Sequence, residues 1–228
     1  MPATPANSRG TGAGVRKGAG PGRPKDPGKR AAILDAAKAM FTQHGFDGAS
    51  MDQIAAAAGV SKLTVYSHFG DKETLFAAAV KAHCERQLPT SLFEADAGAP
   101  LRERLLTVAR AFYAMVTAPE AVAGHRMLCV PQLAGSPLSR LFWEAGPDRV
   151  NREFAGLLQR RVAAGELEIA DVPRAAGQFF ALLKGEPHAM LVFGCGELDA
   201  VGIERHLAAS VDLFLRAYAP GGTAAGRT

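Results

Sequence analysis

Residues 58–76, "AGVSKLTVYSHFGDKETLF", contain a very short predicted helix between two helix-start signals. Ser61 and Asp71 are residues that cap helix N-termini, and Gly70 ends the segment between them. A helix this short is unstable alone in water, so neighbouring helices must hold it in place. The side chains on its exposed face therefore decide what this part of the chain does.

The preceding residues predict a helix-turn-helix arrangement. Ser50, with Gln53 three positions later, predicts a capping box. Gly59 allows the left-handed backbone of a tight turn, and Val65 can pack inward. In this motif the second helix enters the major groove of DNA and the first crosses the DNA backbone. An ordinary helical hairpin with a polar face is the alternative interpretation.

The exposed positions of this motif are candidate contacts to double-stranded DNA. Lys62 and Thr64 offer hydrogen-bonding groups to base edges, and Leu63 offers an apolar contact to a thymine methyl group. Later side chains, and backbone N–H groups at helix starts, can contact sugar–phosphate oxygens. The predicted DNA-binding residues are Arg23, Lys25, Ser50, Met51, Ser61, Lys62, Leu63, Thr64, Tyr66, Ser67, His68 and Lys72.

Positive charge is concentrated at the N-terminus. Residues 1–30 hold seven Lys and Arg residues against one acid, Asp26, whereas the rest of the chain is nearly balanced. Residues 1–25 are rich in Gly, Pro and Ala and should be disordered when free. Such a basic arm suits a polyanion such as DNA, although a solvated tail would have the same composition.

The remainder of the chain has only helical patterns. Periodic apolar residues are separated by Gly, Pro and capping residues, and alternating strand patterns are absent. We therefore predict an all-α protein of nine or ten helices. It should comprise a disordered basic arm (1–25), a helix-turn-helix DNA-binding domain (26–70) and a larger domain (71–220) whose first helix (71–88) connects the two.

Several helix boundaries are specific predictions. Gly45 should stop the first helix, and Pro147 should begin a later one. Asp171 should open a long helix that Pro187 kinks, and Asp199 should open the last helix.

Residues 29–80 resemble the DNA-binding domain of the tetracycline-repressor (TetR) family, nearly without gaps. Matching positions include Phe41, Gly45, Ile54, Ala55, Gly59, Val60, Thr64, Tyr66, His68, Phe69 and Lys72. The resemblance implies a homodimeric repressor that binds a palindromic operator and is released by a small effector. It also implies that Leu63, at a variable position, affects operator choice. By analogy with homeodomain-type readers, Arg23 can enter the adjacent minor groove. A transcriptional activator or dual regulator, or a helical dimer that does not bind DNA, are the alternative functions.

The larger domain should supply the dimer interface. The last helix has one apolar stripe, and the helix before it is rich in large apolar residues. Two such helices per subunit would form a four-helix interface about a two-fold axis, unless the stripes face the subunit's own core. The predicted interface residues are Phe180, Leu183, Met190, Leu207, Val211, Phe214 and Tyr218.

The same domain should contain a cavity for a small hydrophobic effector. Apolar walls with a few polar groups suit such a molecule, although each candidate residue can equally be plain core. The predicted ligand-binding residues are Phe112, Met115, His125, Met127, Phe142, Trp143 and Phe154, and Trp143 is the strongest single candidate.

Other classes of protein find little support in the sequence. Walker, GxSxG and HExxH motifs are missing, so we expect neither an enzyme nor a bound cofactor. The cysteines Cys84, Cys129 and Cys195 have no metal-ligand spacing, so we expect no metal site, while a redox role for one of them remains open. Without a signal peptide or a long apolar run, we expect a cytoplasmic protein with no membrane contact.

Overall fold

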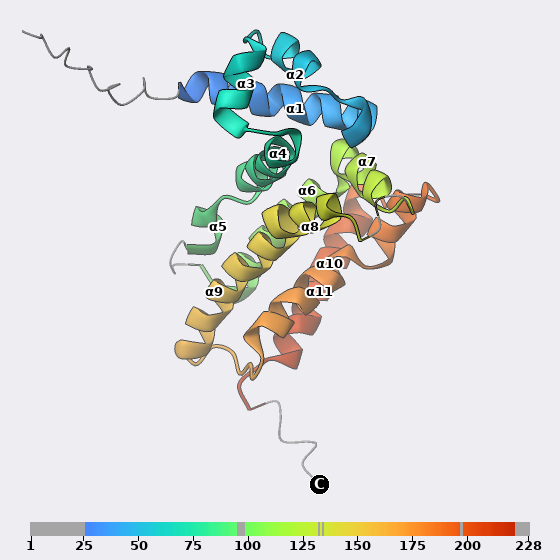
Figure 1. The fold of residues 1–228 in the computed structure, drawn as a ribbon. Helices are drawn as coiled ribbons and strands as arrows, with labels where there is room; N and C mark the ends of the chain where they lie inside the picture. The colour runs from blue at the N-terminus through green and yellow to red at the C-terminus, as the bar shows by residue number, and fades with distance from the viewer. Residues whose placement is uncertain (1–25, 95–98, 132, 134, 197, 222–228) are drawn as a thin grey trace, which may run out of the picture.

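The computed structural model describes residues 26–94, 99–131, 133, 135–196 and 198–221, and within these residues the fold is entirely helical (Figure 1). The all-α prediction is therefore confirmed. The helices are α1 (Pro27–Gly48), α2 (Met51–Ala57), α3 (Lys62–Phe69), α4 (Lys72–Gln87), α5 (Thr90–Glu94), α6 (Leu101–Thr117), α7 (Pro119–Leu128), α8 (Pro137–Trp143), the π-helical turn η1 (Glu144–Asp148), α9 (Arg149–Ala163), α10 (Val172–Phe193) and α11 (Ala200–Ala217).

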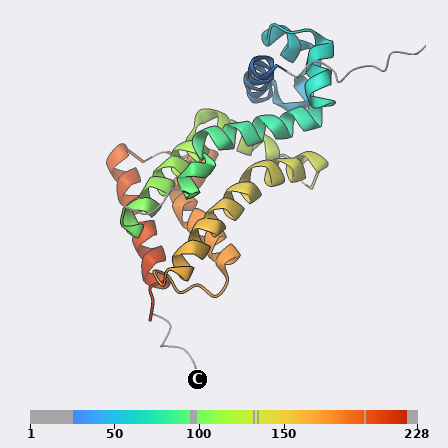
Figure 2. The ribbon, with the colours of Figure 1, turned by 90° about the vertical axis from the view of Figure 1, so that its left-hand side faces the viewer.

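The chain forms two packed groups of helices joined by α4. Helices α1, α2 and α3 form a small N-terminal domain, called here the reading head, whose core includes the fully buried Ile33, Ile54 and Val65. Helices α6, α9, α10 and α11 surround a second core, called here the effector domain. Figures 1 and 2 both show α4 running from the reading head along the effector domain.

The predicted start signals are confirmed where they depend on local sequence. The Asp26 carboxylate accepts a hydrogen bond from the Gly28 amide, and the Asp71 carboxylate accepts one from the Thr74 amide at 2.6 Å. The Asp171 and Asp199 carboxylates cap α10 and α11 in the same way. Side-chain acceptors at these positions satisfy amides that have no partner within the helix.

Three predicted boundaries differ from the structure. Gly45, at φ 70°, kinks α1, but helical structure resumes up to Gly48. Pro147 does not begin a helix but lies inside η1, which continues α8 into α9. The break in α10 falls at Gly185, two residues before Pro187, because glycine can adopt the positive φ of 46° that other residues rarely reach.

A helix that crosses a bilayer needs about 20 predominantly apolar residues. No single helix among the described residues is long and apolar enough to cross a bilayer, and α6 with α7 reaches that length only as a pair bent by 63°.

Candidate DNA-binding surface and effector cavity

Local hydrogen bonds fix the position of α3 in the reading head. The Ser50 hydroxyl accepts from the Gln53 amide while the Gln53 side chain accepts from the Ser50 amide, which completes the predicted capping box. The Thr64 amide donates to the Ser61 hydroxyl at 3.1 Å. Gly59 adopts φ 65°, as the turn between α2 and α3 requires. Because these contacts are local, the sequence predicts them well.

The outward face of α3 presents polar and apolar groups together. Leu63 is 79% exposed and Tyr66 is 42% exposed, so two large side chains stand free of the core. The Lys62 ammonium lies 2.9 Å from a carboxylate oxygen of Asp52 on α2. Val65, as predicted, and Phe69 are buried on the opposite side. The face therefore offers hydrogen-bonding groups and an apolar contact on one short helix, as major-groove readers do.

The structure gives different roles to two predicted DNA contacts. The Lys72 ammonium donates to the carbonyl oxygens of Phe46 and Ala49, at 2.9 and 3.2 Å, and lies 4.3 Å from the centre of the Phe46 ring. It therefore stabilises the C-terminal end of α1, and because an ammonium has three N–H donors, the predicted phosphate contact stays a prediction for the third donor. Met51 has a buried side chain, which leaves only its backbone amide for a phosphate.

The remaining predicted DNA contacts divide into three groups. Ser50, Ser61 and Ser67 are exposed on the reading head, whereas Thr64 is half-buried and hydrogen-bonded to the Ser61 hydroxyl. His68 is half-buried, and its Nδ1 atom has no hydrogen-bond partner among the described residues. Arg23 and Lys25 lie outside the described residues.

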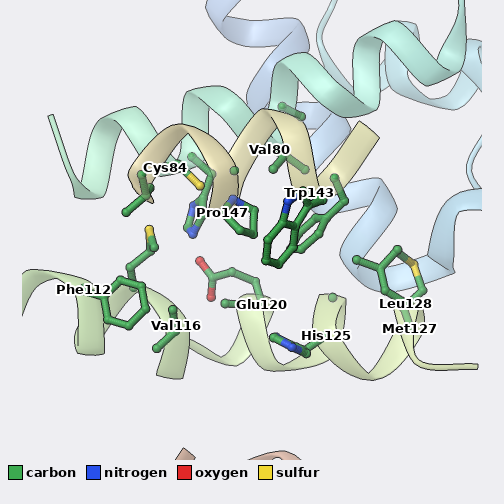
Figure 3. A pocket seen from close by; sticks show the side chains of 18 of the residues that line it. Val80, Cys84, Phe112, Val116, Glu120, His125, Met127, Leu128, Trp143 and Pro147 are labelled. Carbon is green, nitrogen blue, oxygen red and sulfur yellow. The ribbon is translucent and has the colours of Figure 1, made fainter. Parts of the chain in front are cut away.

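A cavity of about 390 Å³ lies where the reading head meets the effector domain. Its size falls in the range of small-molecule sites. Figure 3 shows its walls, with Val80 and Cys84 on α4, Phe112 and Val116 on α6, and Trp143 on α8. Six of the predicted ligand-binding residues line it: Phe112, Met115, His125, Met127, Phe142 and Trp143.

The ligand-binding prediction for Phe154, the seventh candidate, is wrong. Its side chain is fully buried and does not line the cavity. Its ring stacks on Phe179 with centroids 4.5 Å apart and also contacts Phe180 and Phe93. Phe154 is therefore part of the effector-domain core, because an aromatic residue on an amphipathic helix faces whichever apolar surface lies nearest.

The cavity also contains charged residues that sequence reasoning missed. Lys38 of α1 and Glu120 of α7 form an ion pair of 2.5 Å in its wall, and Lys184 of α10 lies nearby in the lining. The Lys38 ammonium lowers the pKa of the Glu120 carboxyl through this hydrogen bond. Burial lowers the pKa of His83 and of His125, so both imidazoles favour the neutral form. Lys38 and Glu120 are far apart in the sequence, so no local pattern indicates that they are in contact.

Comparisons with known proteins follow the same division into two domains. A family profile described as "Bacterial regulatory proteins, tetR family" matches residues 33–79, and one described as "AefR-like transcriptional repressor, C-terminal domain" matches residues 103–220. The second match alone covers more than half of the chain. The chain belongs to the TetR family. Proteins of this family are transcriptional regulators that bind DNA, and not enzymes.

Solved structures of TetR regulators resemble this chain along most of its length. The Flavonoid-responsive Regulator FrrA is 37% identical, with a TM-score of 0.68, and the match covers 85% of this chain and 98% of FrrA. A TetR-family regulator from Pseudomonas syringae is 29% identical, with a TM-score of 0.60 and coverage of 84% and 96%. The regulator RutR of Escherichia coli is 36% identical over 116 residues, which is 48% of this chain and only 50% of RutR.

The predicted dimer residues of this TetR regulator need correction. Within the single subunit, five of the seven predicted residues are buried in the effector-domain core: Phe180, Leu183, Leu207, Val211 and Phe214. Met190 and Tyr218 are half-buried, and the Tyr218 hydroxyl donates to the Gln178 side chain. The apolar stripes of α10 and α11 therefore face each other and α6, which was the alternative reading of the same pattern.

The opposite faces of α10 and α11 are the ones left exposed. On α11 this outward face consists of Arg205, Ala209, Leu213 and Arg216, and on α10 it includes Arg174 and Gln178. Ala181, although exposed, lines the cavity, and Gly185 is turned toward His206 of α11. Ion pairs from α6 to Glu204 and Asp212 hold α11 with this face outward. The small residue Ala209 at the centre of the α11 face allows a close approach by another helix.

The three cysteines should differ sharply in reactivity. Burial raises the pKa of the Cys84 thiol to about 11, whereas Cys129 and Cys195 are exposed. Because the thiolate is the reactive form, we expect Ellman's reagent at pH 8 to titrate two thiols in the folded protein and the third only in denaturant. Replacement of Cys84 by Ser should leave the rapidly reacting count unchanged. Rapid reaction of all three thiols in the folded protein would contradict the burial of Cys84.

Proposed function

We propose that this TetR regulator is a repressor that binds a palindromic DNA operator as a homodimer and is released by a small, largely apolar effector. The observation that carries the proposal is the position of the cavity, whose wall includes α1 of the reading head as well as helices of the effector domain. A molecule bound there contacts both parts and favours the arrangement of reading heads that fits it best.

The dimer would place one α3 in each of two successive major grooves. Half-sites of such operators lie about one helical turn apart, near ~34 Å, so a change in head spacing weakens both contacts at once. The outward face of α11 supports a two-fold interface, because it is exposed and carries the apolar Ala209 and Leu213 at its centre. The apolar aromatic walls of the cavity suit an aromatic effector, and FrrA, by its name, responds to flavonoids.

Binding to the protein's own promoter tests the proposal. Affinity for a promoter fragment and for random DNA of equal length should be measured by fluorescence anisotropy across a range of salt concentrations. We expect the promoter to be preferred by at least roughly 1000-fold, because specific sites exceed random DNA by that factor or more. Equal affinity for both fragments would refute the repressor function, and activation of the promoter by the bound protein would favour the activator alternative.

Two variants of one ion pair should change DNA affinity in opposite directions. Lys62→Gln removes a cation from the face of α3, so we expect roughly tenfold weaker binding and a salt slope reduced in magnitude by about 1. Asp52→Asn removes the carboxylate that holds the Lys62 ammonium, so we expect severalfold tighter binding. The same anisotropy titrations measure both. If both variants lost DNA affinity equally, the ion pair would stabilise the reading head and Lys62 would not contact DNA.

A further inference from the structure

The reading head itself forms one wall of the effector cavity. Lys38, Phe41 and Thr42, all on α1, line the cavity together with residues of α4, α6, α7 and α10. Met127 and Leu128 of α7 pack against the core of the reading head beside this wall. A ligand in the cavity therefore touches α1 directly, in addition to the connecting helix α4.

One ion pair of this wall joins the two domains. The Lys38 ammonium on α1 and the Glu120 carboxylate on α7 are 2.5 Å apart, and both residues line the cavity. Figure 3 shows the Glu120 carboxylate pointing from α7 into the space below Pro147. Both side chains are partly exposed, so water and a charged ligand can compete for either partner.

The charges around this ion pair favour an anion over a cation. Among the lining residues, Lys38 and Lys184 are cationic, and Glu120 is the only carboxylate. Lys184 has no ion-pair partner within the described part of the chain. The Nε2 atom of His83, in the same lining, is buried without a hydrogen-bond partner among the described residues. An acidic group would meet a net positive wall and a neutral imidazole that can hydrogen-bond to it.

We infer that the effector is a largely apolar organic acid whose anionic group pairs with Lys38, displaces Glu120 and so releases α1 from α7. This inference rests on the ligand-responsive function proposed above. Because coupling between two equilibria is reciprocal, any change that removes Glu120 as a competitor must tighten binding of the acid. A change that removes Lys38 must weaken it, although both changes abolish the same ion pair.

A pair of fluorescent probes tests this exchange without DNA. The anion 1-anilinonaphthalene-8-sulfonate and the neutral N-phenyl-1-naphthylamine share the same aromatic skeleton and differ in the acidic group. Fluorescence titrations with the full-length protein should show that Glu120→Gln binds the anion about tenfold more tightly than wild type. Lys38→Met should bind the anion about tenfold less tightly. The neutral probe should change little, and equally, in both variants.

The matched control uses the second ion pair of α1. Asp35 and Arg86 are 2.8 Å apart, join α1 to α4 and do not line this cavity. Asp35→Asn should therefore leave the affinities for both probes within about twofold of wild type. Thermal unfolding of each variant checks that the fold is intact, and the near-isosteric Glu120→Gln keeps the test decisive if Lys38→Met unfolds.

Shifts in the same direction, or a lack of selectivity for the anion, would overturn the inference, whereas a further outcome would overturn only the proposed function. If Glu120→Gln and Lys38→Met shift the affinity for the anion in the same direction, the ion pair is only structural. Equal binding of the two probes to wild type, or binding of neither, would show that the cavity does not select an acid. If the probes behave as expected but the anion leaves promoter binding unchanged, the exchange at Lys38 stands and the proposed ligand-responsive repression fails.

Discussion

Replacement of Phe154 by Ala is expected to lower the free energy of unfolding by about 3–5 kcal/mol. The ring is fully buried and stacks on Phe179, so its removal leaves a cavity that rigid neighbouring helices cannot fill. The total free energy of unfolding of a folded domain is only about 5–15 kcal/mol, so this loss should be visible as a large drop in the urea midpoint. Protein concentration must be held fixed, because the proposed dimerisation would make the midpoint concentration-dependent.

The control for this variant is the same change at an exposed position. Phe193, at the end of α10, is 78% exposed, so Phe193→Ala should alter the free energy of unfolding by no more than about 0.5 kcal/mol. Phe154 is a ligand-binding residue only if its replacement leaves stability nearly unchanged and weakens binding of the aromatic probes. That result would contradict its assignment to the core.

Phe154 also shows why the reading head could be predicted more fully than the effector domain. Ser50, Ser61 and Asp71 cap helices through hydrogen bonds to amides three residues away, so the sequence contains both partners. The face on which Phe154 lies depends on where α10 packs, and no local pattern specifies that. An apolar stripe predicts burial correctly but does not say what covers it.

The ion pair in the cavity wall is the clearest example of a contact that local sequence patterns cannot predict. Lys38 and Glu120 are 82 positions apart, and either one alone resembles an ordinary solvated charge. Their contact depends on how α1 and α7 meet, which follows from the packing of both domains against α4. The hydrogen bonds of Lys72 could not be predicted for a similar reason, because its ammonium reaches the carbonyl of Phe46, which is 26 positions away.

The variant Leu213→Arg is expected to convert the proposed homodimer into monomers. Leu213 is 47% exposed at the centre of the outward face of α11, between Ala209 and Arg216. In a two-fold interface each substitution occurs twice, so two unpaired cations would be buried against the neighbouring arginines. We expect the dimer dissociation constant to rise by about 100-fold or more, as measured by sedimentation velocity.

The consequence for DNA binding follows from the geometry of two half-sites. A monomer presents a single α3, so it loses the second set of contacts and should bind the promoter about 100-fold or more weakly. Val130→Arg is the matched control, because Val130 is 40% exposed but lies after α7, outside the outward face of α10 and α11. It should remain dimeric. If Leu213→Arg stays dimeric while Val130→Arg dissociates, the interface is formed by the α7 end of the effector domain, and the outward face of α11 merely faces solvent.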